Sequence, residues 1–199
     1  GEPLVSHRDV RAISFTGSTL TGNRIVQCAG LKKFSMELGG KSPFIVFDDA
    51  DLARALDAAV FMIFSNNGER CTAGSRILVQ RSIADRFIEQ FVERARNIRL
   101  GDPMQASTEV GPLAFRQHME RVLSYVDIAK ADGAKLLTGG KRAAQFAKGW
   151  FVEPTIFTRT TPDMPGAWAS QMYGKVPAAG NTTVISRVAS LVATRRAPA

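Results

Sequence analysis

The sequence predicts an α/β protein with a partly parallel sheet flanked by helices. Short β-rich runs alternate along the chain with segments whose apolar residues recur at helical spacing. That alternation is typical of a mainly parallel sheet, in which helices connect successive strands. The composition agrees, because 45% hydrophobic and 22% charged residues in a chain of 199 are ordinary for a globular protein.

The first predicted elements form a strand, a helix and a second strand. Residues 12–15 are expected to form a short buried strand, and a turn containing Gly17 leads into a helix that ends near Gly30. Ser18 or the Thr after it can cap that helix. Residues 34–38 form the second strand candidate, which ends at a Gly-Gly turn.

The middle of the chain repeats this alternation. A strand is expected over 43–47, and a long helix should begin at Asp51 because apolar residues follow it at helical spacing. A β-rich strand over 75–80 precedes an amphipathic helix over 82–98. The apolar face of that helix carries Ile83, Phe87, Phe91 and Ala95.

The next elements are shorter and more widely spaced. A turn at 101–103 precedes a predicted helix over 115–131 and a strand over 135–137. Residues 151–157 are expected to be extended.

From about residue 164 the character of the sequence changes. The last 36 residues contain no Asp or Glu and four basic residues, so they supply +4 of the net charge of +8. Residues 182–186 have strand propensity, but otherwise the segment lacks the dense apolar pattern that builds a core. We expect 164–199 to be an atypical basic tail, either disordered or read from a shifted frame.

The composition argues against several functional classes. The longest apolar stretch, near residues 58–64, is too short to span a membrane, and the first residues do not resemble a secretory signal. The basic residues are scattered without interleaved aromatics, which argues against nucleic acid. Two cysteines, Cys28 and Cys71, lack metal-site spacing, so no metal is expected, and a reducing cytoplasm is the expected location.

Two short signatures carry the chemistry. Residues 36–43, Met-Glu-Leu-Gly-Gly-Lys-Ser-Pro, supply the carboxylate of Glu37, and residues 66–76, Asn-Asn-Gly-Glu-Arg-Cys-Thr-Ala-Gly-Ser-Arg, supply the thiol of Cys71. A thiol and a carboxylate suit covalent catalysis, in which sulfur attacks a carbonyl and the carboxylate activates a water for product release.

Several motifs occur together in one order, and in that order they resemble the aldehyde dehydrogenases. The resemblance covers residues 10–163. Besides the two signatures it includes Phe-Thr-Gly-Ser-Thr at 15–19, Gly-Asp-Pro at 101–103, Gly-Pro at 111–112 and Pro-Thr-Ile-Phe at 154–157. Residues 67–76 most resemble the branch that acts on 5-carboxymethyl-2-hydroxymuconate semialdehyde in bacterial aromatic-acid breakdown.

The resemblance implies a domain organisation. Residues 1–38 would be a remnant of the cofactor-binding domain, and residues 39–163 would be the portion of the catalytic domain that bears the nucleophilic thiol. The family is much longer than 199 residues. Its main nucleotide-binding units, its oxyanion-hole Asn and its adenosine-ribose ligands would lie upstream, and a Glu that grips the nicotinamide ribose would lie downstream. This chain is therefore expected to be an internal fragment with an unrelated or frame-shifted tail.

The resemblance also implies a mechanism. Cys71 would attack an aldehyde, hydride would pass to NAD or NADP, and Glu37 would activate the water that hydrolyses the thioacyl enzyme. The backbone N–H of Cys71 could help to hold the oxyanion.

The resemblance further assigns cofactor contacts. Gly17 and Ser18 would lie near the pyrophosphate at a helix N-terminus, and Leu38 would lie beside the nicotinamide. His118 and Arg121 align with positions that touch the cofactor riboses.

Simpler interpretations stand beside these assignments. A free cysteine is often only a small buried hydrophobe, which is the preferred interpretation for Cys28 but not for Cys71. Glu37 could be a surface charge, and His118 could be a solvated helix residue. Arg70 could favour a Cys71 thiolate or point to solvent.

Three functions follow from these assignments. The first is NAD(P)-dependent aldehyde oxidation. The second is a cysteine-dependent esterase or thioesterase that uses Cys71 and Glu37 without a hydride acceptor. The third is an inactive remnant whose exposed sheet edges and apolar faces favour self-association. The expected partners are a small aldehyde or ester and further copies of the chain as a homo-oligomer, with no nucleic acid and no membrane.

Overall fold

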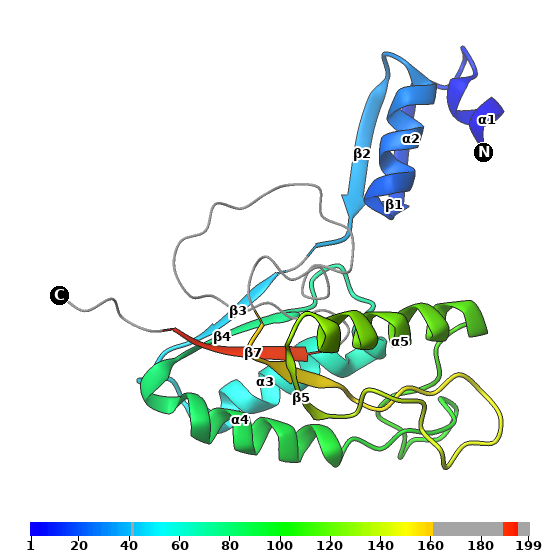
Figure 1. Ribbon diagram of the computed structural model, residues 1–199. Helices are drawn as coiled ribbons and strands as arrows, with labels where there is room; N and C mark the ends of the chain where they lie inside the picture. Colours follow the sequence, from blue (N-terminus) through cyan, green and yellow to red (C-terminus); the bar gives the residue numbers. More distant parts are fainter. Residues whose placement is uncertain (41, 161–188, 195–199) are drawn as a thin grey trace.

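The computed structural model describes residues 1–40, 42–160 and 189–194, and in it a small N-terminal unit stands away from a larger body (Figure 1). The α/β class predicted from the sequence is confirmed, since helices flank sheets whose strand pairs are mostly parallel. None of the helices in the described ranges combines the length and apolarity that a membrane crossing requires.

The N-terminal unit consists of α1 (Glu2–Ser6), β1 (Ala12–Gly17), α2 (Thr19–Ala29) and β2 (Lys33–Leu38). Strands β1 and β2 are parallel neighbours, in register from Ala12 opposite Lys33 to Gly17 opposite Leu38. Helix α2 begins where the Ser18 side chain accepts a hydrogen bond of 3.1 Å from the Thr21 amide, which confirms the predicted cap.

One prediction for this unit is wrong. Strand β1 was expected to be buried, but its residues alternate between half-buried and exposed, and none is fully buried. The reason is that, among the described residues, β1 pairs only with β2 and its main helix neighbour is α2, so two layers do not enclose it.

The larger body contains a five-stranded sheet. Its spatial order is β3 (Pro43–Val46), β4 (Arg76–Gln80), β7 (Ala189–Thr194), β6 (Ile156–Thr158) and β5 (Lys135–Thr138). Every pair is parallel except β5 with β6, which confirms the predicted mainly parallel sheet. The predicted strand over 182–186 lies outside the described residues, whereas β7 begins at Ala189 and was not foreseen.

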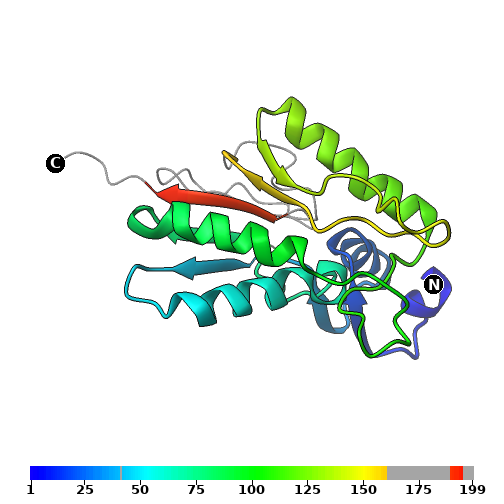
Figure 2. The ribbon, with the colours of Figure 1, turned by 90° about the horizontal axis from the view of Figure 1, so that it is seen from below.

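Helices cover both faces of this sheet (Figures 1 and 2). Adjacent residues of β6 point to opposite faces, so Ile156 joins one buried cluster and Phe157 joins another. Helices α3 (Leu52–Phe64) and α4 (Arg81–Arg96) pack on the Ile156 face, and α5 (Arg116–Ala131) packs on the Phe157 face.

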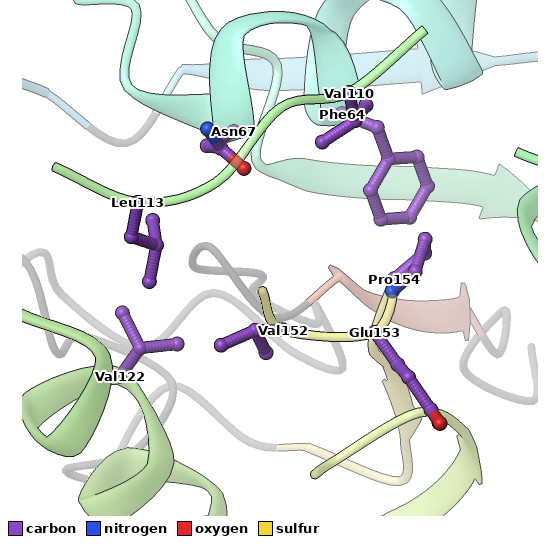
Figure 3. A pocket seen from close by; sticks show the side chains of 8 residues that line it. All are labelled: Phe64, Asn67, Val110, Leu113, Val122, Val152, Glu153 and Pro154. Carbon is purple, nitrogen blue, oxygen red and sulfur yellow. The ribbon is translucent and has the colours of Figure 1, made fainter. Parts of the chain in front are cut away.

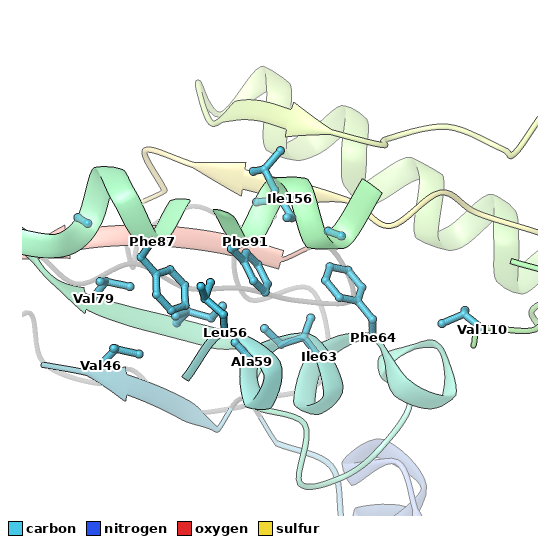
Figure 4. Close-up of a cluster of buried hydrophobic side chains, with 14 residues drawn as sticks. Val46, Leu56, Ala59, Ile63, Phe64, Val79, Phe87, Phe91, Val110 and Ile156 are labelled. Atoms are coloured by element: carbon cyan, nitrogen blue, oxygen red, sulfur yellow. The ribbon is translucent and has the colours of Figure 1, made fainter. Parts of the chain in front are cut away.

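The largest cluster lies between α3, α4 and the sheet (Figure 4). Phe91 is fully buried there, with its ring centroid 5.9 Å from that of Phe64 and 5.7 Å from that of Phe87. Helix α3 begins at the predicted place, because the Asp51 side chain accepts a hydrogen bond from the Arg54 amide. Phe64 is the last residue of α3, so this aromatic stack fixes the end of α3, from which the chain continues toward Cys71.

Candidate active site

Cys71 lies in a turn between the short helix η1 (Ser65–Gly68) and strand β4, and its side chain is exposed. The thiol is therefore accessible, unlike the buried position that a structural cysteine usually takes. We call residues 66–71 the thiol loop.

The thiol loop reverses the chain through an unusual backbone. Asn66 has φ 51° and ψ 44°, Asn67 has φ 55° and ψ 21°, and Gly68 has φ 68°. Three successive residues therefore adopt the left-handed region, which Asn tolerates better than most residues and Gly adopts freely. The Asn-Asn-Gly sequence is itself a signal for such a turn, although no turn was predicted here. Strained backbone of this kind often occurs at functional sites.

Arg70, next to the C-terminal end of the loop, ties it back to the end of α3. Its guanidinium donates a hydrogen bond of 3.0 Å to Ser65 Oγ and lies 4.9 Å from the centre of the Phe61 ring. Arg70 was considered either as a partner of a Cys71 thiolate or as a solvated side chain. In the structure it is half-buried, and its guanidinium contacts the end of α3.

Asn67 and Glu69 of the loop contact the segment around α5. Asn67 Nδ2 donates to the carbonyl oxygen of Pro112 at 3.2 Å, and His118 Nε2 lies 2.9 Å from Glu69 Oε1. The His118 ring also lies 5.7 Å from that of Phe115. These two contacts place His118 against Glu69 of the thiol loop and against Phe115, the residue before α5.

Arg121, the second α5 residue assigned to the cofactor, lies one turn further along the helix and is exposed. Residues three apart on a helix share a face, so Arg121 follows His118 on the same side of α5.

The remaining predicted residues meet at one end of the N-terminal unit. Leu38 lies opposite Gly17 in the parallel pair, and Ser18 follows Gly17 at the start of α2. Leu38 packs against α2 at Gly22, where a Cβ would lie only 3.0 Å from Leu38 Cδ2. The structure therefore brings Gly17, Ser18 and Leu38 together at the carboxyl ends of parallel strands, where α/β proteins commonly bind ligands.

Glu37 is exposed on β2, opposite Thr16, immediately before Leu38. Its carboxylate therefore belongs to the same end of the N-terminal unit as the three predicted cofactor positions.

The segments that carry Glu37 and Cys71 enter neighbouring strands. The first leads into β3 and the second into β4, which are parallel, with Pro43 opposite Arg76. The Arg76 amide also donates to the Ser42 carbonyl at 3.3 Å. Both segments therefore arrive at the N-terminal ends of β3 and β4. Among its described residues the structure shows no direct Glu37–Cys71 contact.

Two further features lie at the start of β4. A Cβ on Gly74 would lie 3.2 Å from Phe44 Cβ, so the chain just after the thiol loop packs closely on β3. Burial lowers the pKa of the Arg76 guanidinium at the first position of β4. Arginine nevertheless stays charged in proteins, so Arg76 places a partly buried cation at the start of β4.

A small cavity of about 40 Å³ lies beside the thiol loop (Figure 3). Asn67 reaches it from the loop and Val122 from α5, and the other lining residues are Phe64, Val110, Leu113, Val152, Glu153 and Pro154. Its volume is enough for water and too small for an aldehyde substrate with a ring or chain. In the described part of the chain no cluster of three or more His, Cys, Asp or Glu residues could hold a metal ion.

Comparisons with known proteins agree with the fold and with the signatures. The sequence profile of the Aldehyde dehydrogenase family matches residues 1–184, which extends beyond both ends of the resemblance found in the sequence. The chain is 54% identical over 161 residues to the 5-carboxymethyl-2-hydroxymuconate semialdehyde dehydrogenase of Escherichia coli, covering 78% of the chain and 34% of that protein. It is 47% identical over 180 residues to the betaine aldehyde dehydrogenase of Brucella anthropi, covering 88% and 37%.

Solved structures give the same result. HpcC from Thermus thermophilus matches with a TM-score of 0.79 at 49% identity, covering 83% of this chain and 34% of that one. Betaine aldehyde dehydrogenase from Staphylococcus aureus in complex with NAD+ matches with a TM-score of 0.84 at 36% identity, covering 96% and 37%. The chain therefore spans about a third of the length of the relatives it matches.

Proposed function

Because the chain belongs to the aldehyde dehydrogenase family, we propose that it carries the thiol centre of an enzyme that oxidises an aldehyde to a carboxylic acid. The observation that carries the proposal is the presentation of Cys71. Its side chain is exposed three residues after the left-handed turn, in a loop whose preceding residues are held by side-chain hydrogen bonds. This loop leads into β4, which lies beside the strand that follows the Glu37 segment.

The proposed chemistry begins with attack of the Cys71 sulfur on the aldehyde carbon, which gives a thiohemiacetal. Loss of the former aldehyde hydrogen as hydride leaves a thioester on Cys71, and NAD(P), when bound, supplies the acceptor for that hydride. Water then attacks the thioester carbon, the carbon–sulfur bond breaks, and the acid leaves with the thiol restored. The backbone N–H of Cys71 is the proposed oxyanion donor.

Glu37 is the proposed general base for that water. A general base needs to be ionised and accessible, and Glu37 is exposed at the end of β2. Its removal should slow hydrolysis of the thioester more than its formation.

The N-terminal unit offers groups suited to the pyrophosphate of a nicotinamide cofactor. Gly17 and Ser18 place the N-terminus of α2 at the end of a parallel pair, an arrangement that favours a pyrophosphate, and Leu38 offers an apolar side chain beside it. We propose these contacts together with ribose contacts from His118 and Arg121. The solved relatives from Staphylococcus aureus support NAD, since they are described as complexes with NAD+.

The substrate is proposed to be a semialdehyde from bacterial aromatic-acid breakdown. The 54% identity to a 5-carboxymethyl-2-hydroxymuconate semialdehyde dehydrogenase supports this choice over betaine aldehyde, for which the identity is 47%. A homo-oligomer working in the cytoplasm remains our expectation for the assembly and its location.

A second activity, hydrolysis of esters without NAD(P), is favoured by what this chain contains. The thiol and the carboxylate are both present, whereas the N-terminal unit supplies a single strand–helix–strand motif toward a nucleotide site. Acyl transfer from an activated ester to Cys71 and hydrolysis assisted by Glu37 need no hydride acceptor.

The test is hydrolysis of a chromogenic acetate ester, measured with and without NAD, by the chain and by its Cys71→Ala variant. Cys28→Ala is the matched control, because it removes the other thiol. Activity lost in Cys71→Ala and kept in Cys28→Ala would support an assembled thiol centre. Absence of hydrolysis, or hydrolysis indifferent to Cys71, would reject the proposal for this chain and favour an inactive remnant.

A further inference from the structure

We infer that His118 and Glu69 form a positioning pair, through which helix α5 fixes the thiol loop and thereby the location of Cys71. The inference rests on the proposed role of Cys71 as nucleophile. His118 acts in it through Glu69 and not by touching the substrate.

The geometry of the pair is that of a direct hydrogen bond. His118 Nε2 lies 2.9 Å from Glu69 Oε1, and their side chains are only 18% and 29% exposed. Glu69 is an exposed residue as a whole, so the bond lies at the surface with its two side chains partly covered. The Phe115 ring, 5.7 Å from the imidazole and one turn earlier in the chain, helps to orient it.

Glu69 is the part of the loop through which such a bond acts on the nucleophile. It precedes Cys71 by two residues, so their Cα atoms are no more than about 7 Å apart along the chain. The bond joins residues 49 apart in the sequence, which makes it a tertiary constraint on the loop rather than a local turn contact.

The cavity beside the loop explains why a polar tether matters here. Asn67, Leu113 and Val122 are among the residues that line this space of about 40 Å³ (Figure 3). Well-packed side chains normally fix the position of a loop, and where packing is incomplete the loop gains freedom to shift. On this side the hydrogen bonds of Asn67 and Glu69 therefore carry the positional constraint.

This role differs from the ribose contact proposed for His118. A ribose contact acts only when the cofactor is bound, whereas a positioning pair acts on the thiol loop in the free protein. An NAD-free measurement therefore separates the two.

The variants are His118→Ala, Glu69→Ala and the double variant, with His118→Gln as the conservative replacement that keeps a side-chain donor. Glu120→Ala is the matched control, because it removes an α5 ion pair with Arg116 (2.7 Å) that does not involve the loop. All are compared by far-ultraviolet circular dichroism to establish folding.

The first readout is amide hydrogen exchange of peptides covering residues 66–72, with an α3 peptide as internal reference. We expect each alanine variant to exchange about fivefold faster in the loop only, and the double variant to exchange no faster than either single one. Glu120→Ala should match the parent. Unchanged loop exchange in both single variants, or additive effects in the double variant, would overturn the inference.

The second readout is the rate constant for acylation of Cys71 by the chromogenic ester without NAD. We expect it to fall about fivefold in both alanine variants and to be restored at least in part by His118→Gln. Full activity in His118→Ala without NAD would refute positioning by His118. If the parent itself does not react with the ester, the proposed function fails, while the exchange experiment still decides whether the pair holds the loop.

Discussion

Truncation of Phe91 tests how much the aromatic core between α3 and α4 contributes to the stability of the fold. Phe91 is fully buried, and its ring stacks on Phe87 and on Phe64, the residue at which α3 ends and the loop region begins. In Phe91→Ala both aromatic contacts disappear and a cavity replaces the ring.

The expected loss follows from these contacts. Burial of a Phe side chain is worth roughly 1.5–3 kcal/mol, and each aromatic pair adds about 0.5–1.5 kcal/mol. Because the surrounding core relaxes only partly, we expect the free energy of unfolding to fall by about 3–5 kcal/mol. At about 2–4 °C for each kcal/mol in a chain of this size, the melting temperature should drop by roughly 6–20 °C.

The assay is thermal unfolding followed by circular dichroism, with Phe47→Ala as the matched control. Phe47 is 61% exposed, so its truncation should change the free energy of unfolding by less than about 0.5 kcal/mol. Phe91→Leu is a milder variant that fills part of the space but loses both ring contacts, so it should lose less stability than Phe91→Ala and keep the chain folded. A Phe91→Ala melting temperature within error of that of Phe47→Ala would refute the reasoning.

Two other predictions concern the periphery of the molecule. Gly139 has φ 70°, and a Cβ there would lie 2.3 Å from the Pro154 carbonyl oxygen, so Gly139→Ala should cost at least about 2 kcal/mol by urea unfolding. Gly111→Ala, where a Cβ meets only ordinary contacts, is its control, and equal midpoints for the two would contradict the prediction. The hydrogen bond from Arg24 lowers the pKa of Glu2, so the stabilisation of α1 by this pair is complete above the usual Glu value of 4.5 and is lost as pH falls through the lowered pKa. In Arg24→Ala an NMR titration should show the pKa of Glu2 raised toward that usual value, and an unchanged titration would exclude the pairing.

Long periodic segments were predictable because local pattern and tertiary packing agree there. Helix α4 was expected over 82–98 and is found at Arg81–Arg96, with Phe87 and Phe91 on its buried face as predicted. Helix α1 was missed because its five residues show no periodicity. The burial expected for β1 was wrong because periodicity identifies an apolar strand but cannot say how many layers will cover it.

The candidate site, too, was predictable only in part. The two signatures identify Cys71 and Glu37 as residues, and the structure adds that Cys71 is exposed and that the two segments feed neighbouring strands. Their roles remain predictions. The bond between Glu69 and His118 could not be predicted, since it joins residues far apart in the sequence and depends on how α5 packs. The left-handed turn before Glu69 could have been predicted from its Asn-Asn-Gly sequence.

The position of β7 in the middle of the larger sheet has a consequence for biosynthesis. Ser190 pairs with Arg76, 114 residues earlier, and among the described strands β7 is the one that joins the β3–β4 pair to the β6–β5 pair. A ribosome-bound chain that has not yet released residues 189–194 holds two half-sheets whose facing edges are unpaired. Such edges recruit strands from other chains, so a stalled or C-terminally clipped product should aggregate more readily than the full sequence.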